Sequence, residues 1–228
     1  MQKTIKAVIF DLDGVIIDSN PEIEKFWHRW AAKTNRQLTR QNIIEHIHGR
    51  KGVETLDALF NDINAETKEA ILRDANEFDS RMSPEPIPGI YHFIQALFKL
   101  NIPIGLVTSS HKKRALLMLE KQSLSNNFEE HVTAEDVTNG KPHPQPYLTM
   151  ATKLNQAPEY CLVFEDAISG VQSAKAAGME VVGINAMAAE NLIANGASYV
   201  LPNFKELTIE QNKLLLKNNG LSYIFQTV

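Results

Sequence analysis

Two alternating patterns of apolar residues run along most of the chain. Short continuous apolar runs, such as residues 102–107 and 161–164, are typical of strands that are buried on both faces. Between them, residues such as 90–98 repeat their apolar positions at the spacing of a helix face. Because parallel strands need a crossover connection, this alternation predicts an α/β fold with a parallel sheet between layers of helices. The predicted strands are 5–10, 102–107, 131–133, 161–164, 181–184 and 199–201.

A different pattern occupies residues 18–83, where helical spacing repeats and no convincing strand interrupts it. Ser19 and Pro21 are typical of a helix start, the first as a capping side chain and the second in the first turn. The stretch that follows has three prolines in seven residues and cannot form a helix. We therefore predict a core domain of residues 1–17 and 84–228, with residues 18–83 inserted as a helical cap domain.

The composition is that of an ordinary soluble globular protein, with 43% hydrophobic and 22% charged residues. The formal net charge is −4 and the basic residues are scattered, which disfavours nucleic acid as a partner. No apolar run reaches the length of a membrane span and no secretion signal is evident, so we expect no membrane association. Cys161 is the single cysteine, which excludes an internal disulfide and is typical of a reducing compartment. We expect a cytoplasmic monomer whose partner is a small molecule.

An acidic turn follows the first predicted strand. Asp11 and Asp13 are two residues apart, so in an extended segment their carboxylates share a face and repel each other unless a cation lies between them. Gly14 provides the backbone freedom for a sharp turn away from the strand. In open α/β sheets, ligands bind at the carboxyl ends of the strands, where this turn lies. The pattern predicts a metal site, and a polar turn that merely ends a strand is the alternative.

Other polar side chains follow later strands in the same way. Thr108 ends one apolar run, and Lys141 lies in a loop after another. Glu165 and Asp166 follow a third. Because parallel strands place their carboxyl ends at one edge of a sheet, we expect these side chains to converge with the acidic turn. Carboxylates, a hydroxyl group and a lysine together suit a hard divalent ion and a phosphoryl group.

These residues resemble the four motifs of the haloacid dehalogenase superfamily, in the same order and at suitable separations. The motif residues are Asp11-Leu12-Asp13-Gly14-Val15, Thr108, Lys141 within Gly-Lys-Pro, and Glu165-Asp166 with Gly170. The resemblance covers essentially the whole chain, and it implies a Rossmann-like three-layer α/β/α core with an inserted α-helical cap. Within the superfamily the chain is similar to the helical-cap branch, which includes sugar- and polyol-phosphate phosphatases and β-phosphoglucomutases.

The resemblance also implies roles for these residues. Asp11 is the expected nucleophile, which forms an aspartyl-phosphate, and Asp13 is the expected general acid and base. A Mg²⁺ ion would be held by Asp11, by Asp13 through its backbone carbonyl, and by Asp166. Thr108 and Lys141 would bind the phosphate oxygens.

Three further residues have two possible roles each. Ser109 is another candidate for phosphate binding, or it starts the next helix. Glu165 either ligates the metal directly or forms hydrogen bonds beside it. Arg50, in a loop between two cap helices, either reads the substrate with its rigid guanidinium fork or belongs to a solvent-exposed basic loop. We expect Arg50 to contribute to substrate specificity.

The motifs favour a magnesium-dependent phosphomonoesterase that acts on a small sugar or polyol phosphate. A β-phosphoglucomutase-type phosphotransferase shares every core residue and is the alternative. Asp13 disfavours a dehalogenase, because a halide leaves without a proton. A binding protein built on a retired enzyme fold would usually have lost Asp11, Asp13 or Lys141, and all three are present. Gln145 stands where the family usually has an acid, so we expect altered hydrogen bonding in that loop without loss of chemistry.

Overall fold

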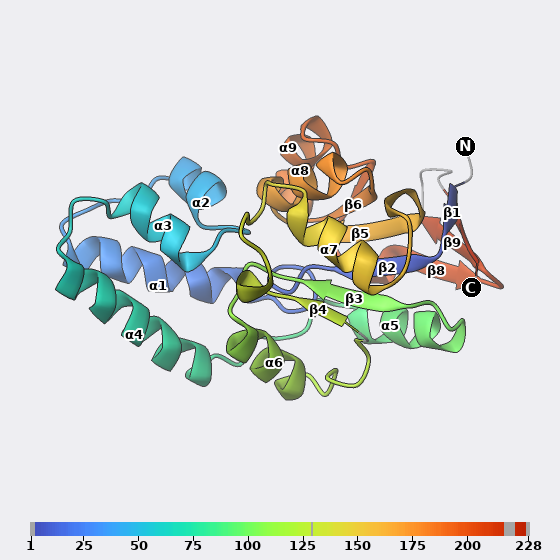
Figure 1. Ribbon diagram of the computed structural model, residues 1–228, viewed down its shortest axis with the longest axis horizontal. Coiled ribbons are helices and arrows are strands. Elements are labelled where there is room, and N and C mark those ends of the chain that lie inside the picture. The colour runs from blue at the N-terminus through green and yellow to red at the C-terminus, as the bar shows by residue number, and fades with distance from the viewer. Residues whose placement is uncertain (1–2, 129, 217–221, 227–228) are drawn as a thin grey trace.

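A six-stranded, fully parallel sheet forms the centre of the protein (Figure 1). The computed structural model describes residues 3–128, 130–216 and 222–226. From edge to edge, the strands are β4 (Glu130–Val132), β3 (Ile104–Val107), β2 (Ala7–Phe10), β5 (Cys161–Glu165), β6 (Glu180–Ile184) and β7 (Tyr199–Leu201). Because β2 lies between β3 and β5, the acidic turn that follows β2 is in the middle of the sheet's carboxyl edge. The predicted α/β fold is confirmed.

Two apolar clusters cover the two faces of this sheet. Along β2, Val8 and Phe10 pack into the first cluster, and Ala7 and Ile9 pack into the second. The helices are α5 (Ile90–Lys99) and α6 (Lys112–Lys121) at the first cluster, and α7 (Gln145–Lys153), α8 (Ile168–Ala176) and α9 (Ala189–Ala194) at the second. Short 3₁₀ helices occur at Ala134–Asp136, Pro158–Tyr160, Ala186–Ala188 and Phe204–Glu206. The central strands are thus buried on both faces, which explains their continuous apolar runs.

The segment between β2 and α5 is helical. Its helices are α1 (Asn20–Lys33), α2 (Arg40–His46), α3 (Gly52–Leu59) and α4 (Ala65–Arg81). They enclose an apolar cluster of their own and lie at the left of Figure 1, at the end of the sheet toward which β3 points. The two connections to the sheet run side by side, since the Asp18 amide donates to the Glu85 carbonyl (2.8 Å) and the Ile87 amide to the Ile16 carbonyl (2.9 Å). Domain boundaries at residues 18 and 83 stay a prediction.

The first predicted strand is in fact two strands. The chain bends at Lys6, so that β1 (Lys3–Ile5) leaves the main sheet and only β2 remains in it. A single lysine in an apolar run gave no reason to expect this change of sheet. The start of α1 also differs in detail, because Ser19 makes no side-chain capping bond and its hydroxyl donates to Asp13 instead.

A second, four-stranded sheet closes the carboxyl-terminal part, in the order β1-β10-β9-β8. Its added strands are β8 (Leu207–Glu210), β9 (Lys213–Leu216) and β10 (Ser222–Phe225). The prediction that residues 199–201 form the last strand was therefore wrong. At the turn between β8 and β9, Gln211 adopts a left-handed conformation (φ 57°) where glycine is usual, so the sequence carries no ordinary hairpin signal there.

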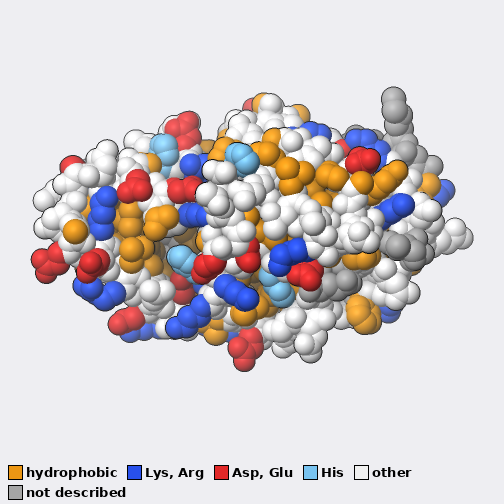
Figure 2. Space-filling view, in the orientation of Figure 1, with side chains coloured by type: hydrophobic (Ala, Val, Ile, Leu, Met, Phe, Trp, Pro, Cys, Tyr) orange, Lys and Arg blue, Asp and Glu red, His pale blue; other side chains and the backbone are white. Residues whose placement is uncertain are grey.

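On the face shown in Figure 2, acidic and basic side chains are interspersed, in agreement with their scatter along the sequence. Within the described part of the chain, no helix combines the length and the apolar character that crossing a membrane requires.

Candidate active site

A buried lysine links the carboxyl ends of three neighbouring strands. Nζ of Lys141 donates to Oδ1 of Asp11 (2.7 Å), to Oε1 of Glu165 (2.5 Å) and to the carbonyl of Val107 (3.1 Å). Burial alone would lower the pKa of Lys141, but the two carboxylates raise it above its ordinary value. The side chain is therefore a fixed positive charge beside Asp11.

Glu165 is fully buried and surrounded by hydrogen-bond donors. Its Oε1 accepts from Lys141 and from the hydroxyl of Tyr147 (2.7 Å), and its Oε2 accepts from the backbone amides of the next two residues (3.1 and 3.3 Å). A Cβ at Gly170 would lie 1.8 Å from Oε1, so glycine leaves the room that this carboxylate occupies. With both oxygens bonded, the geometry favours a role for Glu165 in orienting Lys141 over direct metal ligation.

Three buried carboxylates approach one another at this edge of the sheet. Oxygen atoms of Asp11, Glu165 and Asp166 all lie within 4.8 Å of one another. Burial raises the pKa of Asp11 to about 7, and burial together with Glu165 and Asp11 raises that of Asp166 well above its ordinary value. Because three carboxylates meet the one ammonium group of Lys141, a divalent cation would balance the charge. The hard oxygen donors fit Mg²⁺.

The turn after β2 brings the backbone close to this cluster. Gly14 has a φ of 76°, and a Cβ at this position would lie 2.2 Å from Oδ2 of Asp166. The Asn20 side chain, at the start of α1, donates to the same oxygen (2.6 Å). Glycine is required here both for the left-handed conformation and for the close approach.

Asp13, the predicted acid and base, is held by a guanidinium group. Arg114 donates from Nη2 to Oδ1 and from Nη1 to Oδ2, each at 2.7 Å, and the hydroxyls of Ser19 and Ser110 donate to the same carboxylate. Burial alone would raise the pKa of Asp13, but Arg114 and the hydroxyl groups outweigh it, so the pKa lies below its ordinary value. Arg114 also donates from Nε to Asp79 of α4 (2.8 Å). Asp13 is therefore tied to the helical part of the protein.

The two predicted phosphate-binding hydroxyl groups have different partners. Oγ1 of Thr108 accepts from the Ser110 amide (3.1 Å), and Thr108 lines the cavity. Ser109 lines the same cavity, but its hydroxyl donates to the carbonyl of Gly49 (2.7 Å). Ser109 does not start the next helix, because α6 begins at Lys112. Phosphate binding by Ser109 stays a prediction.

Arg50 lies in the loop between α2 and α3 and lines the cavity. Its Nη1 donates to the carbonyl of Lys141 (2.9 Å), and its Nε lies 3.2 Å from a carboxylate oxygen of Glu54. The neighbouring Lys51 donates to two backbone carbonyls of the core (2.9 and 3.1 Å). This loop is bonded to the core next to Lys141 and is not a free, solvent-exposed basic loop. Substrate recognition by Arg50 stays a prediction.

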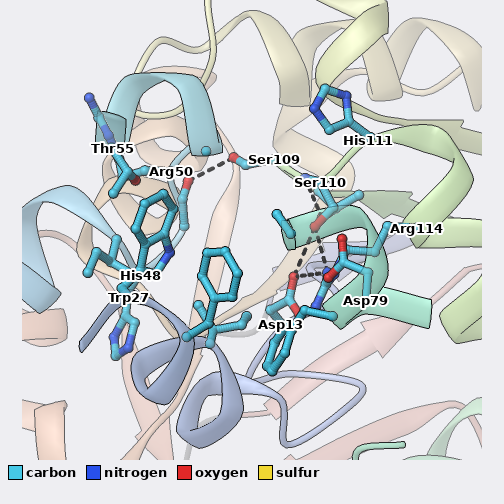
Figure 3. A pocket seen from close by; sticks show the side chains of 18 of the residues that line it. Asp13, Trp27, His48, Arg50, Thr55, Asp79, Ser109, Ser110, His111 and Arg114 are labelled. Carbon is cyan, nitrogen blue, oxygen red and sulfur yellow. Dashed lines mark hydrogen bonds and ion pairs between the residues drawn. The ribbon is translucent and has the colours of Figure 1, made fainter. Parts of the chain in front are cut away.

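A cavity of about 380 Å³ lies between the sheet edge and the helical part. The predicted site residues that line its core side are Asp11, Asp13, Thr108 and Ser109. Figure 3 shows Asp13, Asp79 and Arg114 on one side, across from Trp27 and His48 on the other. The volume is within the range of about 300–1,000 Å³ that is common for ligand sites.

The model of the haloacid dehalogenase-like hydrolase family matches residues 8–184, which is more than half of the chain. The chain belongs to this family. It is 34% identical over 209 residues to hexitol phosphatase A of Escherichia coli (strain K12), a match that covers 90% of the chain and 94% of that protein. It is also 31% identical over 217 residues to the beta-phosphoglucomutase of Bacillus subtilis (strain 168), with 90% and 93% covered.

A solved structure agrees with this assignment. The crystal structure of beta-phosphoglucomutase from Clostridium difficile matches with a TM-score of 0.76 at 27% sequence identity, covering 90% of this chain and 94% of that one. The family and the fold class predicted from the four motifs are thereby confirmed.

Several residues of this haloacid dehalogenase-like site were missed by the sequence analysis, among them Asn20, Asp79, Arg114 and Tyr147. Arg114 lies in the first turn of α6, four residues after Ser110, and this short separation is the signal that could have indicated it. Tyr147 occupies an ordinary buried position of α7, where an aromatic residue predicts no more than packing. Gln145 stands where the family usually has an acid, and its Oε1 accepts a hydrogen bond from the Asn139 amide (2.8 Å).

Proposed function

We propose that the protein is a magnesium-dependent phosphomonoesterase that hydrolyses a small sugar or polyol phosphate through an aspartyl-phosphate on Asp11. One arrangement carries this proposal: Asp11 lies between the ammonium group of Lys141 and the cavity, two residues before Asp13, an acid and base candidate that lines the same cavity. The similarity to proteins named hexitol phosphatase A and, in Thermotoga maritima, phosphorylated carbohydrates phosphatase supports the substrate class.

The first step transfers the phosphoryl group to the protein. Lys141 binds one carboxylate oxygen of Asp11, and the other oxygen attacks the phosphorus atom. As the bond between phosphorus and the substrate oxygen breaks, its electron pair goes to that oxygen, which takes a proton from the protonated form of Asp13. The hydrogen bonds from Arg114 disfavour this form, so Asp13 must gain a proton before this step. Thr108 donates a hydrogen bond to the phosphate oxygens during this transfer.

The second step releases phosphate. Water attacks the phosphorus of the aspartyl-phosphate and gives a proton to the carboxylate of Asp13, while the bond between phosphorus and Asp11 breaks and restores the carboxylate. The hydrogen bonds from Arg114, Ser19 and Ser110 stabilise Asp13 in the ionised form that this step needs. Asp11, Asp166 and the backbone carbonyl of Asp13 would hold Mg²⁺, which would offset the charge of the phosphate.

The test is a panel of sugar and polyol phosphates with Mg²⁺, in which free phosphate is measured. Release from a few of these substrates, absent after chelation by EDTA, would support the proposal. The conversion of β-glucose 1-phosphate to glucose 6-phosphate is followed in parallel, because the similarity to a beta-phosphoglucomutase favours that alternative. Conversion with little free phosphate would replace the hydrolase by a phosphotransferase that uses the same residues.

A further inference from the structure

The lining of the cavity combines polar groups with clustered apolar side chains. Asp13, Asp79 and Arg114 lie together on one side, across from Trp27 and His48 (Figure 3). The apolar lining residues of the helical part include Ile23, Phe26 and Trp27 of α1, and Leu72 and Phe78 of α4; its polar lining residues include His48, Arg50, Thr55 and Asn76. A ligand bound at Asp11 therefore meets both polar groups and an apolar surface.

The apolar lining residues of α1 and α4 form a packed wall. Phe26 packs edge-on against Trp27, with ring centroids 5.3 Å apart, and lies 5.1 Å from the ring of Phe78. Phe26 and Trp27 are buried in the apolar cluster of the helical part, and Ile23 and Phe78 are partly buried against it. The wall is held by this cluster and has little freedom to rearrange into a polar surface.

The apolar wall itself offers no hydrogen bonds to a polyol. Each carbon of a hexitol carries oxygen, and a hydroxyl group that is buried against Ile23 or Phe78 loses its hydrogen bonds to water without gaining others. The apolar faces of a planar ring make no hydrogen bonds to water, so the ring loses none at the wall, and its removal from water is favourable. The polar lining residues, Asp79 among them, suit the hydroxyl groups of a sugar.

We infer that the preferred substrate is a sugar phosphate that carries a planar aromatic ring, of the class of the nucleoside 5′-monophosphates. Its phosphate lies at Asp11, its sugar beside Asp79, and its ring against the wall of Ile23, Trp27 and Phe78. The cavity volume of about 380 Å³ leaves room for both halves of such a molecule. This inference rests on the proposed function, of which it specifies the substrate class.

The decisive experiment compares substrates that differ only in the ring. We would measure kcat/KM with Mg²⁺ for ribose 5-phosphate and for the 5′-monophosphates of uridine and adenosine, which have the same sugar and the same phosphate. At least one nucleotide is expected to exceed ribose 5-phosphate by about tenfold or more, mainly through a lower KM, because the ring adds buried apolar area.

Variants of the wall connect this preference to the structure. Ile23→Asn and Phe78→Asn are expected to reduce the ratio of kcat/KM for the nucleotide to kcat/KM for ribose 5-phosphate toward one. The ratio is measured within each variant, so a loss of folded protein affects both substrates equally. Ile193→Asn is the matched control, because it places the same amide on an exposed site of α9, and it should leave the ratio unchanged.

The possible failures are distinguishable. If ribose 5-phosphate or a hexitol phosphate is hydrolysed as well as or better than both nucleotides, the inference is wrong and the proposed phosphatase stands. A ratio of nucleotide to ribose 5-phosphate kcat/KM that neither wall substitution changes would also contradict the inference. If no member of the panel releases phosphate, the proposed function fails and the inference fails with it.

Discussion

Arg114 binds Asp13 through two parallel hydrogen bonds of 2.7 Å, one to each carboxylate oxygen. The guanidinium group is nearly buried and makes a third bond to Asp79 on α4. A bidentate pair of this kind fixes the orientation of both side chains. The acid and base candidate is thus positioned by a helix of the core, α6, and is connected through it to the helical part.

Replacing Arg114 by alanine should lower turnover in a way that depends on the leaving group. Without the guanidinium fork Asp13 loses its orientation, so kcat for an alkyl phosphate, whose leaving oxygen needs a proton, should fall by about tenfold or more. For p-nitrophenyl phosphate, whose leaving group p-nitrophenolate departs without protonation, the fall in kcat should be much smaller. Steady-state kinetics on both substrates provide the check.

Two further variants calibrate that result. Arg114→Lys keeps the charge and loses the fork, so it should recover only part of the activity. Lys113→Ala, at an exposed position of the same helix, should leave both substrates unaffected. Equal losses on the two substrates would mean that Arg114 supports the fold and not the position of Asp13.

Asp11→Asn should abolish turnover and leave the protein folded. An amide cannot act as the nucleophile, so we expect kcat to fall by about a thousandfold or more. Because the raised pKa of Asp11 shows that its carboxylate is unfavourable in the native state, the neutral amide should not lower the thermal unfolding temperature at pH 8. Substantial remaining phosphate release by this variant would rule out Asp11 as the nucleophile.

The affinity for Mg²⁺ should increase with pH across the neutral range. The pKa of Asp11 is raised to about 7, so below that pH its carboxyl group is protonated and a metal ion must displace the proton. The dissociation constant should therefore fall between pH 6 and pH 8, by up to about tenfold per pH unit below the pKa. Calorimetric titration in buffers of different ionisation enthalpy measures both the affinity and the released proton, and a dissociation constant that does not change with pH would contradict the prediction.

Tyr147→Phe should destabilise the protein, because it removes the buried hydroxyl group that donates to Glu165. Loss of a buried hydrogen bond to a charged group is expected to cost about 1–2 kcal/mol in the free energy of unfolding, as measured by urea denaturation. Tyr160→Phe is the control, because Tyr160 is exposed and the same substitution should change the free energy of unfolding by less than about 0.5 kcal/mol. Equal effects of the two substitutions would show that the bond between Tyr147 and Glu165 contributes nothing.

Much of this protein could be predicted from sequence because the signals are local. The strands around Val107 and Phe164 are buried on both faces, so their apolar runs are continuous, and the polar residues that end them mark the sheet's carboxyl edge. The topology then brings Asp11, Thr108 and Lys141 together without further information. The small carboxyl-terminal sheet escaped prediction, because Gln211 takes the place of the expected turn glycine.

The sequence by itself thus determined the parallel α/β architecture, the family and the residues that meet at the sheet edge. Only the tertiary structure decided their partners: Glu165 accepts hydrogen bonds from Lys141 and Tyr147, and Asp13 accepts them from Arg114. It also decided that apolar residues of α1 and α4 pack together at the cavity. The physical reason is that hydrophobic periodicity records whether a side chain leaves water, whereas a contact between distant residues depends on how whole elements pack.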